Sequence, residues 1–293
     1  MKQLNTLIAC PVCSHSVKED RLSVKDWMIT KTTFTIVKCC SCGFHYTNPI
    51  PCEESIGAYY KSEEYVSHSS SKKGLINWLY NFVRSITLKR KVSLLKFYSS
   101  GKELLDIGAG TSHFLNACQE DSFSVQGLEP DLDARAYAFS NFQISLEDIS
   151  LLSSIESQSK DIVTMWHVLE HVYHLKRDVA DIVRVLKKDG VLFIAVPNMN
   201  SYDAQYYKSH WAAYDVPRHL YHFQPETIRF LFDQFDMECI QTLPMKFDSY
   251  YVSMLSEKYK GGSSLSAIYR GFISNFKGRK QGYSSQIYVF KKK

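Results

Sequence analysis

The stretch LLDIGAGTSHFL, residues 104 to 115, constrains the fold most because it places two glycines between an apolar run and an amphipathic run. The apolar run predicts a buried parallel strand. The run after the glycines predicts a helix, with Thr111 or Ser112 near its N-cap. A strand, a glycine loop and a helix in this order bring backbone N–H groups close to a bound ligand. The stretch therefore predicts a ligand site at the carboxyl end of a strand.

Strands and helices alternate after this loop. One helix is predicted over DVADIVRVLKKDG, residues 178–190. Further strands are predicted over SVQGLEP (124–130), FQISLED (142–148), DIVTMW (161–166) and GVLFIAVPN (190–198). Strands that alternate with helices pack as a parallel sheet with helices on both faces. The sequence therefore predicts an α/β fold with a Rossmann-like, doubly wound sheet.

The glycine loop does not match a dinucleotide-binding loop. The pattern G-x-G-x-x-G would need glycines at Gly108, Gly110 and position 113, where the chain has His113. A ligand without a pyrophosphate does not need that third glycine, and S-adenosylmethionine is such a ligand. Its usual loop, D-x-G-x-G, is present as Asp106, Gly108 and Gly110, with Ser112 in place of a frequent last glycine.

Acidic residues follow the next two predicted strands. Glu129 lies 19 residues beyond Gly110, where a carboxylate can accept hydrogen bonds from both ribose hydroxyls. Asp148 ends the third predicted strand and is expected to accept a hydrogen bond from the adenine amino group. His167 follows the fourth and is expected to line the cofactor pocket, because parallel neighbours end at one edge of the sheet.

Two CxxC pairs lie near the N-terminus: Cys10 with Cys13, and Cys39 with Cys42, separated by 25 residues. Two such pairs can present four thiolates to one tetrahedral zinc ion, and the stretch between them, including FTIVK, can form a β-ribbon. Because four thiolates leave no open coordination position, the site is predicted to be structural. The alternative is a redox pair or a chance arrangement of cysteines.

Composition limits the class of protein. The chain has 293 residues, a net charge of +5 and a pI of about 8.6, with lysines concentrated near the C-terminal end. This mild charge is explained by a solvated tail and predicts no nucleic-acid partner. No apolar run reaches the roughly 18 residues that a membrane span needs. With no secretory signal, we expect a cytoplasmic protein with reduced thiols. The sequence does not indicate an oligomeric state.

Three parts of the chain are predicted. Residues 1–52 form the zinc-ribbon module, residues 53–100 form a helical linker or cap, and residues 101–293 form the large α/β domain. Insertions at about 199–224 and 246–284 are expected on the side of the acceptor substrate.

Residues 103–245 resemble a class I S-adenosylmethionine-dependent methyltransferase. The resemblance rests on LLDIGAGTSHFL, GLEPD, DIVTMWHVLEHV, RVLKKDGVLFIAVPN and DVPRHLYHF. It implies a seven-stranded sheet, S-adenosylmethionine as methyl donor, and a small-molecule or sugar-linked acceptor. The cysteine pairs resemble the zinc-binding N-terminal part of a subset of these enzymes, which includes some sugar C-methyltransferases.

Methyl transfer needs positioning of donor and acceptor, and a base when the acceptor is a hydroxyl, amine or C–H group. His171 with Glu170 beside it suits this role, because imidazole titrates near neutral pH. His219 is the next candidate for the base. The same Glu-His pair occurs in related sugar and quinone methyltransferases. The alternative is that this pair only caps the following helix and lines the cofactor pocket.

The segment after the fifth strand is rich in aromatic residues, as a small-molecule pocket is. Trp211 and Tyr214 are candidates for its walls. Arg218 and His219 are candidates to hold a carboxylate or phosphate of the acceptor. The alternative is an aromatic cap packed on the sheet, with Arg218 in a structural ion pair.

Two other functions remain as alternatives. An NAD-dependent oxidoreductase would need the missing third glycine. A non-catalytic binding module on the same scaffold would not need the intact Asp–Gly–Gly loop or Glu129.

Overall fold

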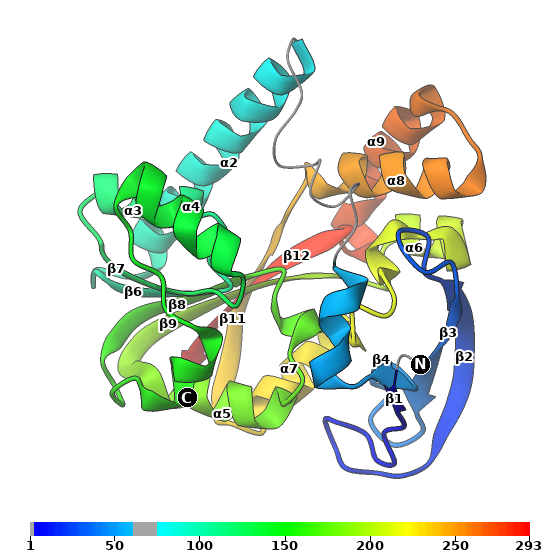
Figure 1. The fold of residues 1–293 in the computed structure, drawn as a ribbon, viewed down its shortest axis with the longest axis horizontal. Coiled ribbons are helices and arrows are strands. Elements are labelled where there is room, and N and C mark those ends of the chain that lie inside the picture. The colour runs from blue at the N-terminus through cyan, green and yellow to red at the C-terminus, as the bar shows by residue number, and fades with distance from the viewer. Residues whose placement is uncertain (1–2, 61–74) are drawn as a thin grey trace.

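The computed structural model describes residues 3–60 and 75–293, without the side chains of residues 75–81. A large α/β layer occupies one half of the molecule, and a small all-β part lies beside it (Figure 1). The chain runs from the small sheet through a long helix into the large sheet, and its last strand lies second from one edge of that sheet.

The large sheet has six strands in the described part of the chain, in the order β11-β12-β9-β8-β6-β7. Strands β7, β6, β8 and β9 run parallel, whereas β12 is antiparallel to both of its neighbours. The strands are β6 (Glu103–Ile107), β7 (Ser124–Leu128), β8 (Lys160–Trp166), β9 (Leu186–Pro197), β11 (Met237–Pro244) and β12 (Ser285–Lys292). The predicted doubly wound α/β fold is therefore confirmed as a mostly parallel sheet.

Helices cover both faces of this sheet (Figure 1). Successive strand residues point to opposite faces, so Leu104 packs under one helix layer while Leu105 packs under the other. One layer contains α2 (Leu75–Tyr98), α3 (His113–Glu120) and α4 (Leu132–Phe142), and the other contains α5 (Leu175–Val185) and α7 (Pro225–Asp233). Burial on both faces explains why these strands read as continuous apolar runs.

The strand expected over residues 142–148, which would have been the seventh of the sheet, does not form. After α4 the chain makes a single parallel bridge, between Leu128 and Glu147. It then turns at Asp148, whose side chain accepts a hydrogen bond from the Ser150 N–H and begins the 3₁₀ helix η2 (Ile149–Ser154). A side chain that satisfies the first N–H groups of a helix favours that helix over a longer strand.

The helix expected over 178–190 ends earlier, at Val185. Leu186 already pairs with Lys160 of β8, and its carbonyl oxygen accepts a hydrogen bond from Lys292. Leucine and lysine have only a small free-energy preference for a helix, and the sheet contacts of these residues outweigh it. A register irregularity before Ile162 accommodates the extra residues of β9.

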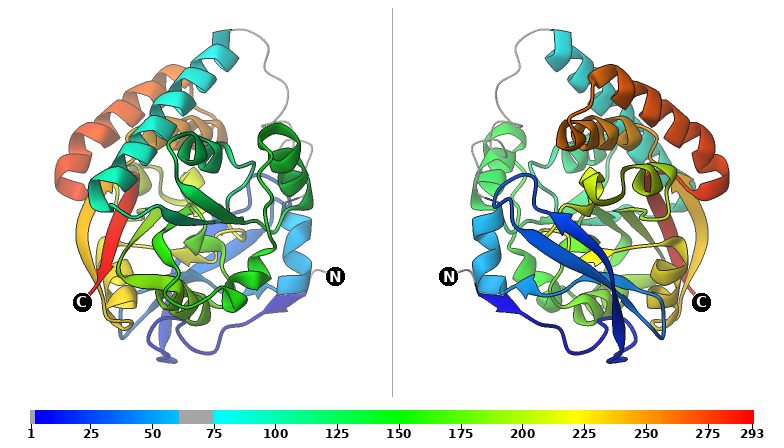
Figure 2. Two further views of the ribbon diagram at one scale, coloured as in Figure 1. Left: turned by 90° about the vertical axis from the view of Figure 1, so that its left-hand side faces the viewer. Right: turned by 90° about the vertical axis from the view of Figure 1, so that its right-hand side faces the viewer.

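The small sheet has the order β10-β4-β3-β2, and its strands β2 to β4 are blue in the right-hand view of Figure 2. Its strands are β2 (Lys18–Lys25), β3 (Thr33–Cys39), β4 (His45–Thr47) and β10 (Tyr221–His222). A further pair joins β1 (Leu4–Asn5) to β5 (Ile50–Pro51), and the 3₁₀ helix η1 (Glu53–Tyr59) follows. Because β10 comes from the acceptor-side segment, the small sheet contains two distant parts of the chain.

One apolar core extends across both sheets. Val12, Phe44 and Tyr46 of the N-terminal part are buried in the same cluster as Ile182 of α5 and Leu231 of α7. The division of the chain at residues 52 and 100 stays a prediction, but these contacts cross it.

Short helices follow β9, and a helical hairpin follows β11; whether they lie on the side of the acceptor stays a prediction. They are α6 (Tyr202–Tyr207), η4 (Lys208–His210), η5 (Ala212–Tyr214), α8 (Asp248–Lys260) and α9 (Ser264–Gln281). Asp203 holds this layer together, because its buried carboxylate accepts hydrogen bonds from Trp211 Nε1, Ser274 Oγ and Ser284 Oγ. Within residues 3–60 and 75–293, no helix is long and apolar enough to cross a membrane.

Candidate active site and cysteine centre

The four cysteines of the CxxC pairs come from two turns of the same shape. Ser14 and Gly43, each four residues after the first cysteine of its pair, have positive φ angles of 62° and 75°. Their N–H groups donate to the carbonyl oxygens of Cys10 and Cys39 at 2.9 and 3.0 Å. Glycine adopts this conformation without strain, whereas serine does so at some cost. Two equivalent turns that face each other are the backbone arrangement that a four-thiolate site requires.

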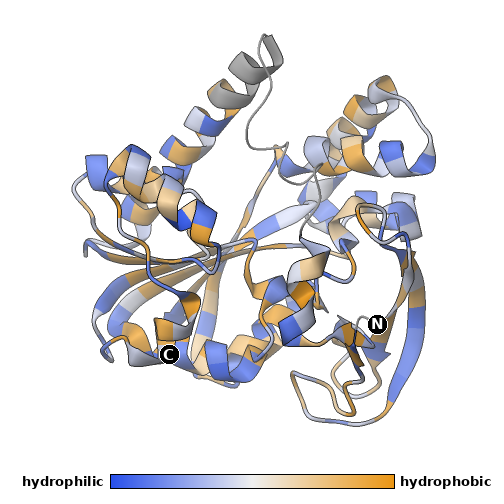
Figure 3. Cartoon of the chain, viewed as in Figure 1, coloured by the Kyte–Doolittle hydropathy of each residue, from blue (hydrophilic) through white to orange (hydrophobic). Residues whose placement is uncertain are grey.

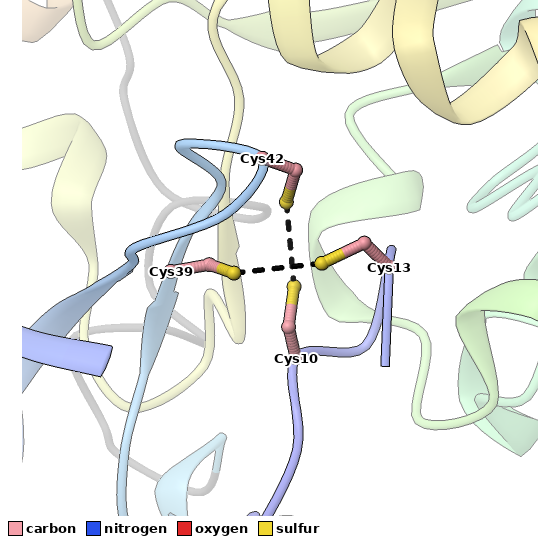
Figure 4. Close-up of side chains that lie close together, drawn as sticks. All are labelled: Cys10, Cys13, Cys39 and Cys42. Carbon is pink, nitrogen blue, oxygen red and sulfur yellow. Dashed lines mark hydrogen bonds between the residues drawn. The ribbon is translucent and has the colours of Figure 1, made fainter. Parts of the chain in front are cut away.

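The four sulfur atoms point toward one centre (Figure 4). Cys10 Sγ lies 3.6 Å from Cys42 Sγ, and Cys13 Sγ lies 3.5 Å from Cys39 Sγ. All four ligand atoms lie within 4.8 Å of one another. Four sulfurs at a Zn–S distance of about 2.3 Å would be about 3.8 Å apart at the corners of a tetrahedron. The cluster therefore has the ligand type, number and spacing that fit a zinc ion.

The glycine loop joins β6 to α3 in left-handed conformations. Gly108 and Gly110 have φ angles of 73° and 52°, and Ser112 has 61°. A Cβ atom on Gly108 would lie 2.4 Å from a methyl group of Val168, so only glycine fits there. Glycine is frequent at this point of such loops because it adopts a positive φ angle, like that of Ser112, without strain. Ser112 Oγ is buried, with no hydrogen-bond partner in the described part of the chain.

Glu129 closes the loop from the end of β7. One of its oxygens accepts from the Gly110 N–H at 2.7 Å, and the other accepts from the Asp131 N–H at 3.0 Å. Burial raises the pKa of the Glu129 carboxyl, although these hydrogen bonds oppose the shift. Each carboxylate oxygen keeps a second acceptor position. The structure thus brings Glu129 to the glycine loop, as the sequence predicts.

Asp106 lies under the loop and is buried. It accepts a hydrogen bond from Thr164 Oγ1 of β8 at 2.5 Å. Burial raises the pKa of the Asp106 carboxyl to about 7, against the opposing effects of Thr164 and of the cation Lys91. Lys91, on α2, lies 3.9 Å from the centre of the Trp166 ring. Asp106 therefore joins the end of β6 to β8, just before the glycine loop.

Asp148 lies at the start of η2 rather than at the end of a strand. Its carboxylate accepts from Ser150 N–H and Oγ, at 3.0 and 2.7 Å, and from Arg135 Nη2 at 3.3 Å. The Ser150 hydrogen bonds lower the pKa of the Asp148 carboxyl. The expected contact with adenine stays a prediction.

His167 lies between two carboxylates. Its Nε2 is 2.9 Å from Asp248 of α8, and its Nδ1 is 3.3 Å from Glu170. Burial alone would lower the pKa of His167, but the hydrogen bonds with Asp248 and Glu170 outweigh it and raise the pKa to about 10. His167 is thus a positive charge that ties α8 to the turn after β8. Sequence reasoning missed Asp248, because 81 residues separate it from His167 and no motif joins them.

The charge on His167 predicts a pH dependence of stability. A folded-state pKa of about 10, above the ordinary 6.5, gives stability that is fully present below pH 6.5 and is lost as the pH rises through about 10. We expect the melting temperature of wild type to exceed that of His167→Gln most at pH 6 and least above pH 10. Thermal unfolding of both proteins across this range measures the difference. A difference that grows with pH would contradict the charged state.

His171 and His219 lie side by side, with ring centres 4.6 Å apart. His171 Nδ1 donates to the Arg218 carbonyl oxygen at 3.0 Å, and His219 Nδ1 donates to the Ala213 carbonyl oxygen at 2.8 Å. Because a carbonyl oxygen only accepts, the proton of the neutral His171 ring lies on Nδ1, which also contacts the Tyr60 hydroxyl at 3.0 Å, and the lone pair is on Nε2. Burial, helped by the nearby His219, lowers the pKa of His171 to about 4.

Glu170 completes this group. It is fully buried, and its Oε2 has no hydrogen-bond partner among the described residues. One ligand atom from each of Glu170, His171 and His219 lies within 4.8 Å of the others. Burial would raise the pKa of the Glu170 carboxyl, but the His167 hydrogen bond and charge lower it, so it stays ionised. The structure therefore brings together the three residues that the sequence proposes for catalysis.

The candidate acceptor residues are more deeply buried than a free pocket wall would be. Trp211 and Tyr214 pack edge to face with ring centres 4.9 Å apart, and both are almost fully buried. Arg218 is buried too and is paired with Asp215 at 2.5 Å and with Asp26 of the small sheet at 3.2 Å. Its Nη1 donates to the Tyr59 carbonyl oxygen. This arrangement agrees with the alternative given above, in which Arg218 forms a structural ion pair inside an aromatic cap.

Fold and site together define a class of enzyme. The glycine loop and Glu129 follow β6 and β7 of a mostly parallel sheet, and Glu170 and His171 follow the neighbouring strand β8, where they meet His219. The methyltransferase-domain family matches residues 82–242, more than half of the chain, and the chain belongs to that family. It is an S-adenosylmethionine-dependent methyltransferase, which decides against the oxidoreductase and the non-catalytic module.

Two curated relatives are both named ubiquinone biosynthesis O-methyltransferase. The one from Glaesserella parasuis is 34% identical over 109 residues, 33% of this chain and 46% of that protein. The one from Haemophilus ducreyi is 25% identical over 186 residues, 58% of this chain and 77% of that protein. The chain thus matches about half the length of the first relative.

A solved structure shows the same fold. The S-adenosylmethionine-dependent methyltransferase of Archaeoglobus fulgidus superposes with a TM-score of 0.51 at 19% identity. The match covers 71% of this chain and 94% of that one. The four cysteines of the CxxC pairs lie outside residues 82–242, which the family matches.

Proposed function

We propose that this enzyme transfers the methyl group of S-adenosylmethionine to a hydroxyl oxygen of a small aromatic acceptor, with His171 as general base. The observation that carries the proposal is the state of His171: half-buried, uncharged, and with its lone pair on Nε2. The names of both curated relatives favour oxygen as the methylated atom and a quinone precursor over a sugar-linked acceptor.

The step balances without another reactant. His171 Nε2 takes the proton of the acceptor hydroxyl while the oxygen attacks the methyl carbon. The carbon–sulfur bond breaks, and its electron pair stays on sulfur, which leaves neutral S-adenosylhomocysteine. Glu170, buried beside the ring, stabilises the imidazolium that forms. Because the donor is an activated sulfonium, positioning and one proton transfer are all that the protein must supply.

We infer that the cofactor lies across the ends of β6 and β7. Gly108 and Gly110 allow close approach of the backbone, and the free acceptor positions of Glu129 suit the ribose hydroxyls. The buried and unpartnered Ser112 Oγ is a further polar group at this loop. The catalytic Glu170–His171 pair then follows the neighbouring strand β8, at the same edge of the sheet.

A panel of acceptors tests the chemistry. The enzyme is incubated with methyl-labelled S-adenosylmethionine and with dihydroxybenzoates, aminophenols and nucleotide sugars, and release of S-adenosylhomocysteine is measured. We expect turnover with the dihydroxybenzoates and a methyl ether as product by NMR. A product methylated on carbon or nitrogen, or turnover only with the sugars, would refute the proposal.

Removal of the Glu129 carboxylate is expected to weaken cofactor binding. Glu129→Ala should bind S-adenosylhomocysteine about 10- to 150-fold more weakly, since hydrogen bonds to a charged group contribute about 1.5–3 kcal/mol. Glu147→Ala is the matched control, because this exposed acid bonds only the Gln126 side chain. Calorimetry with both variants measures the effect. Equal affinities would show that Glu129 supports the loop without contacting the ribose.

We also infer that the four cysteines hold a structural zinc ion. Cys10, Cys13, Cys39 and Cys42 would fill its coordination sphere, so it would offer neither a bound water nor a Lewis-acid position. Its contribution would be to the folding of the small sheet.

A further inference from the structure

Helix α9 exposes bulky apolar side chains in a row. Spacings of three and four residues place them on one face of the helix, within an arc of about 100°. Each of the five is between 57% and 80% exposed: Leu265, Ile268, Tyr269, Phe272 and Phe276. We call this row the α9 apolar face. Figure 3 shows apolar residues on this outer hairpin, away from the large sheet. A continuous apolar surface of this kind marks an interaction site.

The opposite face of α9 carries small residues, and it is the buried one: Ala267, Gly271, Ser274 and Gly278. A Cβ atom on Gly271 would lie 2.7 Å from the ring of Tyr250 in α8. Ser274 Oγ donates to Asp203 at 2.8 Å. Because only small side chains fit against α8 and α6, the helix cannot rotate to bury its large residues. The packing of the small residues therefore makes the α9 apolar face point outward.

Charge completes the pattern. Helix α9 contains Arg270, Lys277, Arg279 and Lys280 and no acidic residue. Lys277 and Arg270 extend over the rings of Tyr202 and Tyr206, each at 4.1 Å from the ring centre. Arg279 and Lys280 are exposed at the C-terminal end of the helix. Aromatic and aliphatic residues on one face, with cations beside them, are typical of helices that lie in a membrane interface.

We propose that α9 docks this enzyme on a bilayer that contains anionic lipids, with the α9 apolar face between the headgroups and with Arg279 and Lys280 on the lipid phosphates. A second copy of the chain fits this surface less well. In a contact between two copies of α9, Arg279 and Lys280 would meet no acidic residue of the helix, because it has none. Anionic lipids supply the negative charge that such a contact lacks.

The docking helix is connected to the active-site layer. Helix α8, which packs against α9 in the hairpin, begins at Asp248, and the Asp248 carboxylate contacts His167 at 2.9 Å. The docking proposal does not depend on the chemistry proposed for His171, so each can fail without the other.

Vesicle sedimentation with the full-length enzyme tests the proposal. We expect binding to vesicles of phosphatidylcholine mixed with phosphatidylglycerol, and little binding to phosphatidylcholine alone. High salt should weaken the binding, because it screens the lysines and arginines. The double variant Phe272→Ser/Phe276→Ser should bind at least about tenfold more weakly, since each ring loses its transfer into the interface.

A matched control is Phe97→Ser/Phe139→Ser, which removes two exposed rings from α2 and α4 and should bind vesicles as wild type does. Thermal unfolding and S-adenosylhomocysteine binding confirm that each variant is folded. Failure of wild type to bind the mixed vesicles, or equal binding by the two double variants, would overturn the proposal. So would a concentration-dependent dimer that the Phe272/Phe276 variant abolishes, if vesicles are not bound.

Discussion

Replacing Cys39 by serine is expected to abolish metal binding and to destabilise the whole chain, not only its N-terminal part. A structural zinc site with four thiolates contributes about 10–16 kcal/mol of apparent binding free energy, which appears as folding free energy. Strand β3 ends at Cys39, and its neighbour β4 pairs with β10 from the acceptor-side segment. The buried Arg218–Asp26 pair also joins the two parts. We therefore expect one cooperative unfolding transition at a much lower temperature.

Metal analysis and thermal unfolding measure this prediction, with Cys40→Ser as the control. Cys40 is the next residue, is exposed, and takes no part in the sulfur cluster. Wild type and Cys40→Ser should each hold one zinc ion per chain, and Cys39→Ser none. If Cys39→Ser keeps its zinc, the metal assignment is wrong. If it loses zinc but binds S-adenosylhomocysteine with unchanged stability, the chain divides at residue 52 into independent modules.

The second large effect is expected at the active site. His171→Ala should lower turnover by about 10²- to 10⁴-fold, the usual contribution of a general base. Its affinity for S-adenosylhomocysteine should stay near that of wild type, because the cofactor is expected at β6 and β7. Added imidazole should restore part of the activity, which a purely structural role of His171 would not allow.

His174→Ala is the matched control for this variant. His174 lies three residues further on and pairs with Glu53 at 3.2 Å on the surface, so its removal should leave turnover unchanged. Steady-state rates with an acceptor from the panel give the comparison. Full activity of His171→Ala would move the role of base to His219, whose ring lies beside that of His171.

Local patterns predicted the parallel core because each of its signals lies within a few residues. The apolar run at 104–107, the glycines of the loop and the acid at Glu129 were all placed correctly by spacing alone. Two predictions were wrong: the helix that was expected to reach residue 190, and the strand that was expected over residues 142–148. At both points hydrogen bonds decided against the pattern: sheet bonds of Leu186, and the N-cap of Asp148.

The candidate site was predictable in part. The Glu170–His171 pair lies within one motif, and His219 was already the next candidate for the base. The roles of Arg218 and His167 depended on partners far away in the chain. Asp26 lies 192 residues from Arg218, and Asp248 lies 81 residues from His167. Neither partner shows a pattern that single-sequence reasoning can connect.

The sequence by itself determined the class of fold, the methyl donor and the four cysteines, because glycine conformation, strand period and ligand spacing are local properties of the chain. Only the tertiary structure decided which histidine is charged and which face of α9 is exposed. It shows that His167 is charged while His171 is neutral, since carboxylates surround one ring and burial dominates at the other. It also shows that α9 turns its small residues inward and its large ones outward, because only small side chains fit against α8.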